Sequence, residues 1–258
     1  MSQEQTLRER LLAGPTRYGL SMVSMSPAAV EVAGLCGLDF VWLELEHAAT
    51  DMMAMEHLCR AAELRGLLTL LRVQEVSRTA VLRALEVGGK IIVVPQVHTP
   101  EDAASVVEWG KFAPIGNRGF NTGSRGLAYG FSGSTTTEIL DRANRDTCLL
   151  VQIESAQAVQ NAEAIIATEG LDGILLGPGD LSASMGIAGQ WENEKLLSDI
   201  EGVFALARKY QKVIATVCPS NVMTRRLKAA GAHLLNVGGD LGMMKTALLP
   251  RLDEIRAL

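Results

Sequence analysis

Aromatic residues are scarce in this sequence, making up 4% of its 258 residues, although 48% of the residues are hydrophobic. A core built from such a chain must be aliphatic, and Leu, Val, Ile and Ala are the side chains that fill barrel interiors and the helix faces around them. Basic residues are not in excess either, because the formal net charge is −5 at pH 7. That balance argues against nucleic-acid binding, which usually leaves a basic footprint.

Cysteine is also rare, and the four residues present, Cys36, Cys59, Cys148 and Cys218, show no CxxC spacing. They fall within predicted helices or strands, so we interpret them as reduced core thiols and not as a disulfide or zinc framework. No run approaches the roughly 18 apolar residues that a membrane-spanning helix needs. Residues 1–14 are polar and charged, unlike a signal peptide. We therefore expect a soluble, cytoplasmic protein that does not bind membranes.

Short apolar runs recur along almost the whole chain, and most are continuous, as expected of parallel strands buried on both faces. Eight are predicted as strands: Tyr18–Val23, Phe40–Leu45, Leu67–Val73, Ile91–Pro95, Cys148–Ile153, Gly173–Leu176, Val213–Val217 and His233–Val237. Amphipathic stretches between them are predicted as helices: Met52–Arg65, Arg78–Val87, Glu101–Trp109, Ala156–Thr168, Glu194–Tyr210 and Val222–Ala230. This alternation predicts one closed (β/α)8 TIM barrel, a single domain over residues 1–258, in preference to a doubly wound sheet.

One long interruption, Phe112–Arg145, separates the fourth and fifth predicted strands. It is rich in Gly, Ser and Thr and contains the segment Pro114–Gly119. A loop of this length in a compact domain is usually functional, or it indicates a misread element. We interpret it as a functional loop.

Barrel enzymes carry out their chemistry at the carboxyl ends of the strands, so polar residues can be sorted by position. One rim collects histidines, an arginine, amides and several acids: Glu44, Glu46, His47, Arg72, Gln96, His98, Gln152, Glu154, Asp180, Cys218, Ser220 and Asp240. Two other histidines are interpreted as structural, because His57 is predicted in the middle of a helix and His233 at the opposite end of the barrel.

The histidine, the arginine and two of the acids on this rim suggest a chemistry. Histidine titrates near neutral pH, so His47, with acids beside it, is the best general-base candidate, and the loop histidine is held in reserve. Arg72 closes a buried strand, where it either forms a structural ion pair or holds a substrate carbonyl or developing enolate oxygen. Glu154 and Asp180 could each cap the following helix. Two carboxylates on one rim also suit a hard divalent cation with open positions for a chelating substrate.

Lysine is absent from the strand ends at this rim. Lys90 and Lys212 enter their strands from the opposite end of the barrel. A Schiff-base mechanism needs a desolvated lysine at the site. The sequence therefore favours a metal in that role.

Six segments carry a resemblance to a known family, and they occur in the family's order. They are Asp39–Ala48, the strand end at Arg72, Val93–Pro95, Pro114–Gly119, Val151–Glu154 and Gly177–Ser182. Together, from about Tyr18 to Leu249, they resemble the HpcH/HpaI aldolases, metal-dependent pyruvate aldolases of the phosphoenolpyruvate/pyruvate barrel superfamily. The resemblance implies reversible cleavage of a 4-hydroxy-2-oxo acid into pyruvate and an aldehyde through a metal-bound enolate. It also implies Mg2+, Mn2+ or Co2+, and a homo-oligomer such as a hexamer built as a trimer of dimers.

The resemblance further implies a role for each matching residue. Glu154 and Asp180 look like the protein ligands of the metal. Arg72 looks like the donor to the keto oxygen, and His47 like the base, acting directly or through a metal-bound water. Gln152, with the backbone amides at residues 179 and 180 (Gly179 and Asp180), is expected near the substrate carboxylate.

Two positions depart from the family pattern. Family aldolases commonly carry Asp at the position of Glu44, where it forms a dyad with the histidine. Glu44 keeps the charge but adds a methylene, so its carboxylate must fold back to make the same contact. Ser21 stands where some relatives carry a bulky aromatic residue, which we interpret as a change in acceptor preference. Arg125, in a loop that varies within the family, could contact an acceptor carboxylate.

Other functions and assemblies stay open on the sequence alone. Related citrate-lyase-β-like proteins act on CoA thioesters, and other relatives make citrate from oxaloacetate or form the same enolate by decarboxylation. The turn Gly238-Gly239 could bind a phosphate or simply begin the last helix. A non-catalytic barrel that binds a keto acid is the alternative from another class. The apolar pattern of Gly239–Leu258 suits a helix exchanged with a neighbouring subunit and equally one that closes its own barrel.

Overall fold

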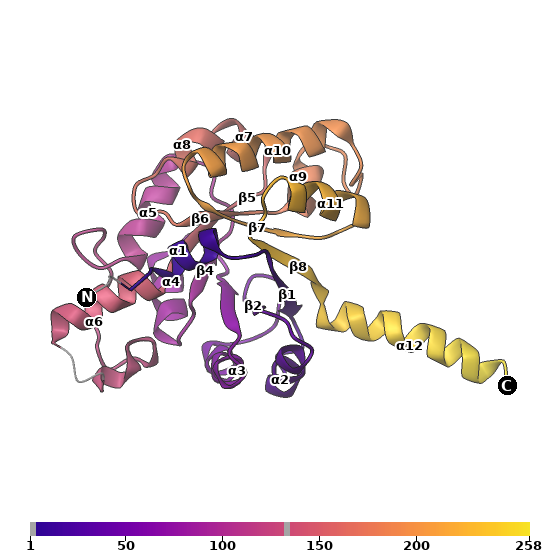
Figure 1. Ribbon diagram of the computed structural model, residues 1–258, viewed down its shortest axis with the longest axis horizontal. Coiled ribbons are helices and arrows are strands. Elements are labelled where there is room, and N and C mark those ends of the chain that lie inside the picture. Colours follow the sequence, from indigo (N-terminus) through magenta and orange to yellow (C-terminus); the bar gives the residue numbers. More distant parts are fainter. Residues whose placement is uncertain (1–3, 132–134) are drawn as a thin grey trace.

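The computed structural model describes residues 4–131 and 135–258 (Figure 1). Its strands form one closed parallel barrel in chain order, with β8 paired back to β1. The strands are β1 (Arg17–Met22), β2 (Phe40–Glu44), β3 (Leu68–Arg72), β4 (Ile91–Val94), β5 (Cys148–Ile153), β6 (Gly173–Leu176), β7 (Val213–Val217) and β8 (Leu234–Gly239). The predicted (β/α)8 architecture is confirmed, and the predicted strand boundaries hold to within two residues.

Helices precede, connect and follow the strands, and the connecting helices lie around the outside of the barrel (Figure 1). They are α1 (Leu7–Ala13), α2 (Pro27–Leu35), α3 (Met52–Leu64), α4 (Arg78–Glu86), α5 (Pro100–Gly110), α6 (Thr136–Asp146), α7 (Ala156–Gln160), α8 (Ala162–Ile166), α9 (Pro178–Ser184), α10 (Glu194–Lys209), α11 (Asn221–Ala229) and α12 (Asp240–Arg256). A short 3-10 helix, η1 (Arg125–Gly130), precedes α6.

Part of the segment predicted as a long loop between the fourth and fifth strands is helical. Its second half forms α6, which begins at a capping box made by Thr135 and Glu138, and η1 lies before it. Side chains from the segment bury a small core of their own, formed by Phe112, Leu127, Ile139 and Ala143. The prediction was wrong because it rested on the Gly, Ser and Thr content of the whole segment, whereas Ile139, Leu140 and Ala143 recur at helical spacing within α6. Residues 132–134 of the predicted loop lie outside the described residues.

A second predicted helix, Ala156–Thr168, is broken into α7 and α8. Asn161 sits at the break with φ −93° and ψ 5°. Its side-chain amide donates a hydrogen bond of 2.8 Å to the carbonyl oxygen of His98. The break therefore ties the segment after β5 to the loop after β4, next to the catalytic rim.

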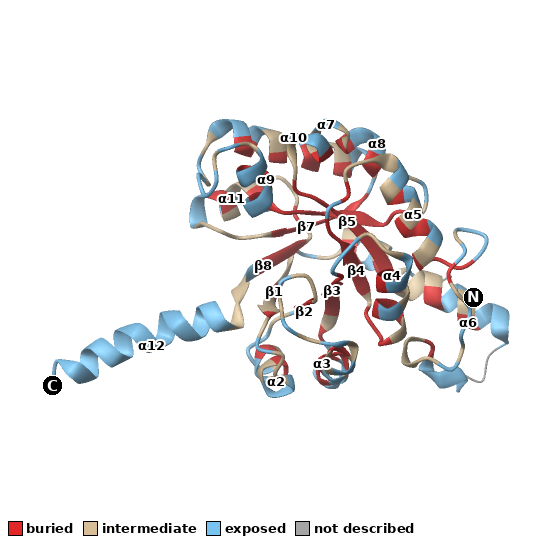
Figure 2. Ribbon diagram, turned by 180° about the vertical axis from the view of Figure 1, so that it is seen from behind, coloured by how far each residue is buried: buried red, intermediate tan, exposed pale blue. Residues whose placement is uncertain are grey.

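Most of the strand residues are buried (Figure 2), and their side chains divide between the barrel interior and the layer beneath the helices. The interior is closed at its amino end by α1, whose Leu7 and Leu11 are fully buried with the inward-facing strand residues. Higher in the barrel the interior holds Phe40, Trp42, Leu70 and Leu175. Glu44, Arg72 and Gln152 replace these apolar residues at the carboxyl ends of β2, β3 and β5, which leaves that end for chemistry.

α12 leaves the barrel and projects from it as an arm (Figures 1 and 2). None of its residues is buried. Asp240 fixes the direction in which it leaves, because its carboxylate accepts hydrogen bonds from the backbone N–H of Val23 (3.1 Å) and of Ser24 (3.0 Å), and from the Ser24 hydroxyl. The last helix therefore does not close its own barrel.

The four cysteines are free. Cys59 and Cys148 are buried as expected, but Cys36 is exposed, so the interpretation as core thiols was wrong for that residue. Burial raises the pKa of the Cys59 thiol to about 12, which leaves it protonated and unreactive. Across the described ranges, no helix has the length and apolar character to cross a membrane.

Candidate active site

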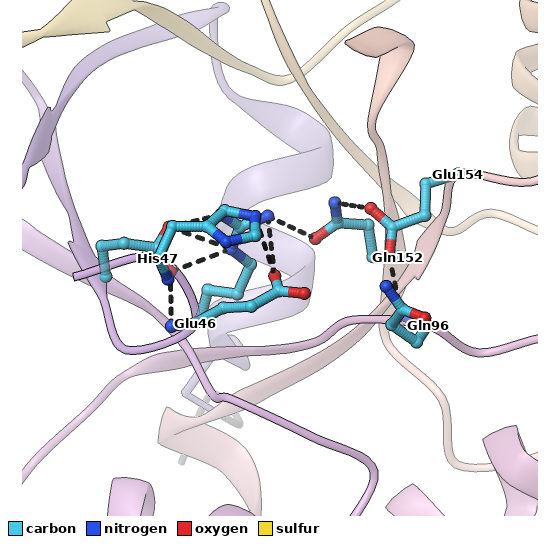
Figure 3. Close-up of polar contacts among 7 residues, drawn as sticks. Glu46, His47, Gln96, Gln152 and Glu154 are labelled. Atoms are coloured by element: carbon cyan, nitrogen blue, oxygen red, sulfur yellow. Dashed lines mark hydrogen bonds and ion pairs between the residues drawn. The ribbon is translucent and has the colours of Figure 1, made fainter. Parts of the chain in front are cut away.

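Polar side chains gather inside the barrel mouth at the carboxyl ends of three strands. Glu44 ends β2, Arg72 ends β3, and Gln152 and Glu154 lie at the end of β5. All four side chains are buried. Their inward direction follows from strand alternation, because alternate residues of a strand point to the same face. Figure 3 shows Gln152 between Glu46 and His47 on one side and Glu154 and Gln96 on the other.

Arg72 is the centre of this cluster. Its Nε donates to Glu44 Oε2 at 2.9 Å and its Nη2 to the same oxygen at 2.6 Å. Its Nη1 lies 3.0 Å from Glu46 Oε2 and 3.4 Å from Gln152 Oε1. The guanidinium also stacks 5.0 Å from the centre of the Trp42 ring. A planar guanidinium held from three sides has little freedom to turn, so the N–H groups that these contacts leave free point in fixed directions.

The Glu44 carboxylate is fully engaged by Arg72 and by the turn that follows β2. Its Oε1 accepts hydrogen bonds from the backbone N–H of Glu46 at 2.7 Å and of His47 at 3.2 Å. Glu44 therefore contacts His47 through the backbone and makes no hydrogen bond to the imidazole among the described contacts. The extra methylene of this glutamate carries the carboxylate to Arg72.

The imidazole of His47 instead faces Glu46. His47 Nε2 lies 3.8 Å from Glu46 Oε2, and the His47 side chain is 61% exposed whereas that of Glu46 is 12% exposed. Burial raises the pKa of the Glu46 carboxyl, and the positive charge of Arg72 offsets only part of that rise. The site thus presents the exposed imidazole of His47 beside the largely buried carboxyl group of Glu46.

Both oxygens of Glu154 are oriented by hydrogen bonds. Oε1 accepts one of 2.8 Å from the backbone N–H of Gln96, and Oε2 accepts one from the side-chain amide of Gln152. Gln96 has a φ of +59°, which is uncommon for a residue other than glycine. Gly177 leaves the room that this pair needs, since a Cβ there would lie 2.8 Å from Gln152 Nε2.

Glu154 is also the most perturbed acid of the rim. Burial raises its pKa to about 7, and the negative charges of Asp180 and Glu46 contribute to the rise. Asp180 lies in the first turn of α9 and is exposed. A divalent cation between such carboxylates would offset their repulsion and the cost of burying Glu154, so the donor set fits a hard metal.

The possible metal ligands are few. No group of three or more His, Cys, Asp or Glu residues in the described part of the chain is arranged to hold a metal ion. A site made by Glu154 and Asp180 alone would leave most coordination positions to water and substrate. That open arrangement is the one expected of a catalytic hard-cation site, in contrast to a closed structural one.

Other predicted rim residues serve the scaffold. The His98 ring contacts Ser155 Oγ through Nδ1 at 3.0 Å and so braces the loop that presents Gln96. Ser220 caps α11, and Asp240 anchors α12. Arg125 contacts Glu63 and the carbonyl oxygen of Val87, on the outer helical layer, and is not part of the cluster.

Sequence reasoning missed two contributions to the site. Trp42 lies beneath Arg72, and its buried indole N–H has no hydrogen-bond partner among the described residues. The backbone N–H of Gln96 orients Glu154. The position of Trp42, two residues before Glu44 on the same face of the strand, could have revealed the first, but nothing in the sequence reveals a backbone donor.

A cavity of about 1210 Å3 lies at the opposite end of the barrel. It is lined by α1, α6 and residues such as Lys212 and His233. Lys212 donates to the carbonyl oxygens of Thr168 and Leu171, and none of the rim residues reaches this cavity. Cavity size therefore does not identify the site, and the chemistry of the rim does.

Residues 17–247 match the HpcH/HpaI aldolase/citrate lyase family. A 5-keto-4-deoxy-D-glucarate aldolase of Klebsiella pneumoniae is 33% identical over 246 residues, which are 95% of this chain and 94% of that protein. The solved structure of an HpcH/HpaI aldolase from Desulfitobacterium hafniense has a TM-score of 0.90 at 28% identity, covering 99% of this chain and 98% of that chain. The solved structure of the citrate synthase SbnG has a TM-score of 0.87 at 26% identity, over 98% of both chains.

Proposed function

Because this chain belongs to the HpcH/HpaI aldolase/citrate lyase family and is a metal-dependent aldolase, we propose that it reversibly cleaves a 4-hydroxy-2-oxo acid into pyruvate and an aldehyde. The Klebsiella relative is named for a deoxy keto sugar diacid, and we propose a substrate of that chemical type. The observation that supports the proposal is the Arg72 fork held beside a pair of carboxylates and an accessible histidine.

Glu154 and Asp180 are the residues that would hold the metal, which we propose to be Mg2+, Mn2+ or Co2+. When bound, a divalent metal supplies Lewis-acid polarisation of the substrate keto group. The protein contributes a prepositioned carboxylate, because hydrogen bonds from Gln96 and Gln152 fix both oxygens of Glu154.

Arg72 would donate to the keto oxygen as negative charge develops on it. An arginine has five N–H donors, and hydrogen bonds to Glu44 and Gln152 engage Nε, one N–H of Nη2 and one N–H of Nη1. Glu46 lies against Nη1 as an ion-pair partner. The second N–H of Nη2 has no hydrogen-bond partner among the described residues, so it is available to substrate, and the other contacts hold it in place. Such preorganised donors stabilise charge without having to reorganise during the reaction.

His47 would take the proton from the carbon next to the keto group and return it in the reverse direction. Its exposed imidazole lies at the mouth of the site, next to Arg72 through Glu46. The substrate carboxylate would meet the first turn of α9, where no side chain caps the backbone N–H groups of Gly179 and Asp180. Gln152 would contribute its second amide N–H to the same carboxylate.

Exchange of the pyruvate methyl protons for deuterium tests the proposal without knowledge of the aldehyde. Protein stripped with a chelator is incubated with pyruvate in heavy water, with and without Mg2+, Mn2+ or Co2+, and the methyl signal is followed by NMR. We expect metal-dependent exchange that falls by about 100-fold or more in His47→Ala, the contribution typical of a general base.

His57→Ala is the matched control for that variant, since His57 is exposed in the middle of α3. It should exchange protons at the parent rate. Absence of exchange with every metal would contradict the pyruvate assignment. Formation of an enolate from oxaloacetate is then the second candidate, supported by the similarity to the citrate synthase SbnG, and consumption of oxaloacetate would be the measurement.

We further propose that α12 packs on a neighbouring copy in a homo-oligomer, a hexamer built as a trimer of dimers. The arm exposes a row of large apolar side chains, which a monomer rarely leaves in water: Leu241, Met243, Met244, Leu248, Leu249, Leu252 and Ile255. The outward-facing residues of β1 and β8 are only partly covered by their own chain, since Leu20 is partly buried and Val237 is 36% exposed. An apolar arm and a partly covered apolar flank on the same molecule are complementary.

The double substitution Leu248→Glu, Leu249→Glu should dissociate this assembly. Placing two charges on the apolar face makes burial of that face costly, so we expect sedimentation to shift from the oligomer to the monomer. Lys245→Ala, on the same helix, is the control and should leave the assembly intact. Sedimentation of the parent as a monomer at micromolar concentration would contradict the proposal.

A further inference from the structure

The turn after β2 presents two carboxylates to one histidine, and only one of them has an oxygen left for it. The oxygens of Glu44 accept hydrogen bonds from Arg72 and from the backbone N–H groups of Glu46 and His47. Because Nε and Nη2 of Arg72 both donate to the Glu44 carboxylate, rotating this carboxylate toward the imidazole would break several hydrogen bonds at once. Glu44 is therefore committed to the arginine and the turn.

Glu46, in contrast, has a carboxylate oxygen that accepts no hydrogen bond among the described contacts. Its Oε2 is buried and lacks a hydrogen-bond partner among the described residues, although Arg72 Nη1 lies 3.0 Å away as an ion-pair partner. A buried acceptor without a hydrogen bond is costly, and few occur in native structures. The imidazole Nε2 of His47 lies 3.8 Å from this same oxygen. That distance is longer than a hydrogen bond, but the exposed ring can rotate to close it.

We propose that Glu46, and not Glu44, is the carboxylate that orients the His47 imidazole. Glu46 accepts a hydrogen bond from the Nε2–H group of His47, which leaves Nδ1 as the nitrogen that exchanges a proton with the substrate. Arg72 joins the two acids, since it holds Glu44 by Nε and Nη2 and Glu46 by Nη1. Glu46 is thus a positioning residue that acts through His47. Its catalytic consequence rests on the proposed function, whereas the contact itself does not.

The contact is tested by NMR without substrate. Protein labelled with 15N-histidine is loaded with Mg2+, and the signal of His47 is assigned by its loss in His47→Gln. We expect a protected imidazole Nε2–H resonance in the parent and in Glu44→Gln, and its loss in Glu46→Leu, which has no acceptor. Persistence of the resonance in Glu46→Leu together with its loss in Glu44→Gln would overturn the proposal.

The catalytic consequence is tested by the kinetics of deuterium exchange into pyruvate. Glu46→Leu should lower the maximal exchange rate by about 10- to 100-fold, the effect typical of losing a carboxylate that orients a histidine. The pyruvate concentration at half-maximal rate should change by less than about threefold, because Arg72 keeps its contacts with Glu44. Glu46→Gln should fall between the parent and Glu46→Leu, since its amide oxygen still accepts a hydrogen bond from the imidazole.

A merely structural role for Glu46 predicts a different pattern, in which the half-saturating pyruvate concentration rises with the loss of rate and Glu46→Gln gives no rescue. Either that pattern or an unchanged rate in Glu46→Leu would refute the orienting role. Glu75→Gln is the matched control, an exposed acid beyond the end of β3, and should behave as the parent. If the parent itself exchanges no protons, the proposed function fails, while the NMR experiment still decides the contact between Glu46 and His47.

Discussion

Arg72→Ala is expected to lower the maximal rate of pyruvate proton exchange and of aldol cleavage by about 100- to 1,000-fold. Loss of one preorganised donor to a developing oxyanion typically has an effect of this size. Arg72 holds that donor in place through Glu44, Glu46 and Gln152, so its removal also disorganises the site. A turnover within a few-fold of the parent would show that the arginine has been assigned the wrong role.

The same substitution should destabilise the fold, which complicates its interpretation. Removing the arginine leaves Glu44 and Glu46 without their cation, and breaking a buried ion pair costs about 3–5 kcal/mol. Arg72→Lys separates the two effects, because lysine keeps the charge but cannot reproduce the planar fork. We expect Arg72→Lys to unfold in urea close to the parent yet to remain slow in turnover. Arg78→Ala, at an exposed arginine of α4, should match the parent in both measurements.

The barrel could be predicted from the sequence because its strands are short apolar runs with one repeated period. The prediction failed at α6, where the Gly, Ser and Thr content of the surrounding segment outweighed the helical spacing of Ile139, Leu140 and Ala143. It also failed at Asn161, whose side chain supports a break because of a contact with the backbone of His98, far away in the sequence. Periodicity reports burial along one element, and it contains no information about such long-range polar contacts.

The candidate site was predictable in its members but not in its pairings. Strand ends placed Glu44, Arg72, Gln152 and Glu154 on one rim, because every inward-facing residue at a carboxyl strand end meets the same mouth. Which acid contacts which base depends on side-chain rotamers. Glu44 illustrates this, since its carboxylate contacts Arg72 and makes no hydrogen bond to the His47 imidazole among the described contacts.

The charges along the rim explain why a cation is expected beside Glu154 and Asp180. Arg72 lies against Glu44 and within 3.0 Å of Glu46, so its single charge already serves two acids. Glu154 and Asp180 have no cation of their own among the described contacts. The raised pKa of Glu154 is the signature of that excess negative charge combined with burial.

Metal binding is therefore expected to weaken steeply as the pH falls below about 7, the pKa of Glu154 in the metal-free protein. A carboxylate ligand must be deprotonated, so metal and proton compete for it. With one proton released per ion, the affinity for Mn2+ should drop by up to about tenfold per pH unit. Calorimetry at several pH values between 5 and 8 measures this slope.

Glu154→Gln should abolish both the tight binding of Mn2+ and its dependence on pH. The group's pKa lies above its ordinary value of 4.5 in the folded protein, so its contribution to stability is complete below about pH 4.5 and is lost as the pH rises through 7. Without metal, the parent should therefore lose thermal stability across that window, and Glu154→Gln should lose less, because its neutral amide never ionises. Glu169→Gln, at an exposed acid, should follow the parent. Equal Mn2+ affinity in the parent and in Glu154→Gln would remove Glu154 from the metal site, whereas parallel stability curves would show that its ionisation costs the fold nothing.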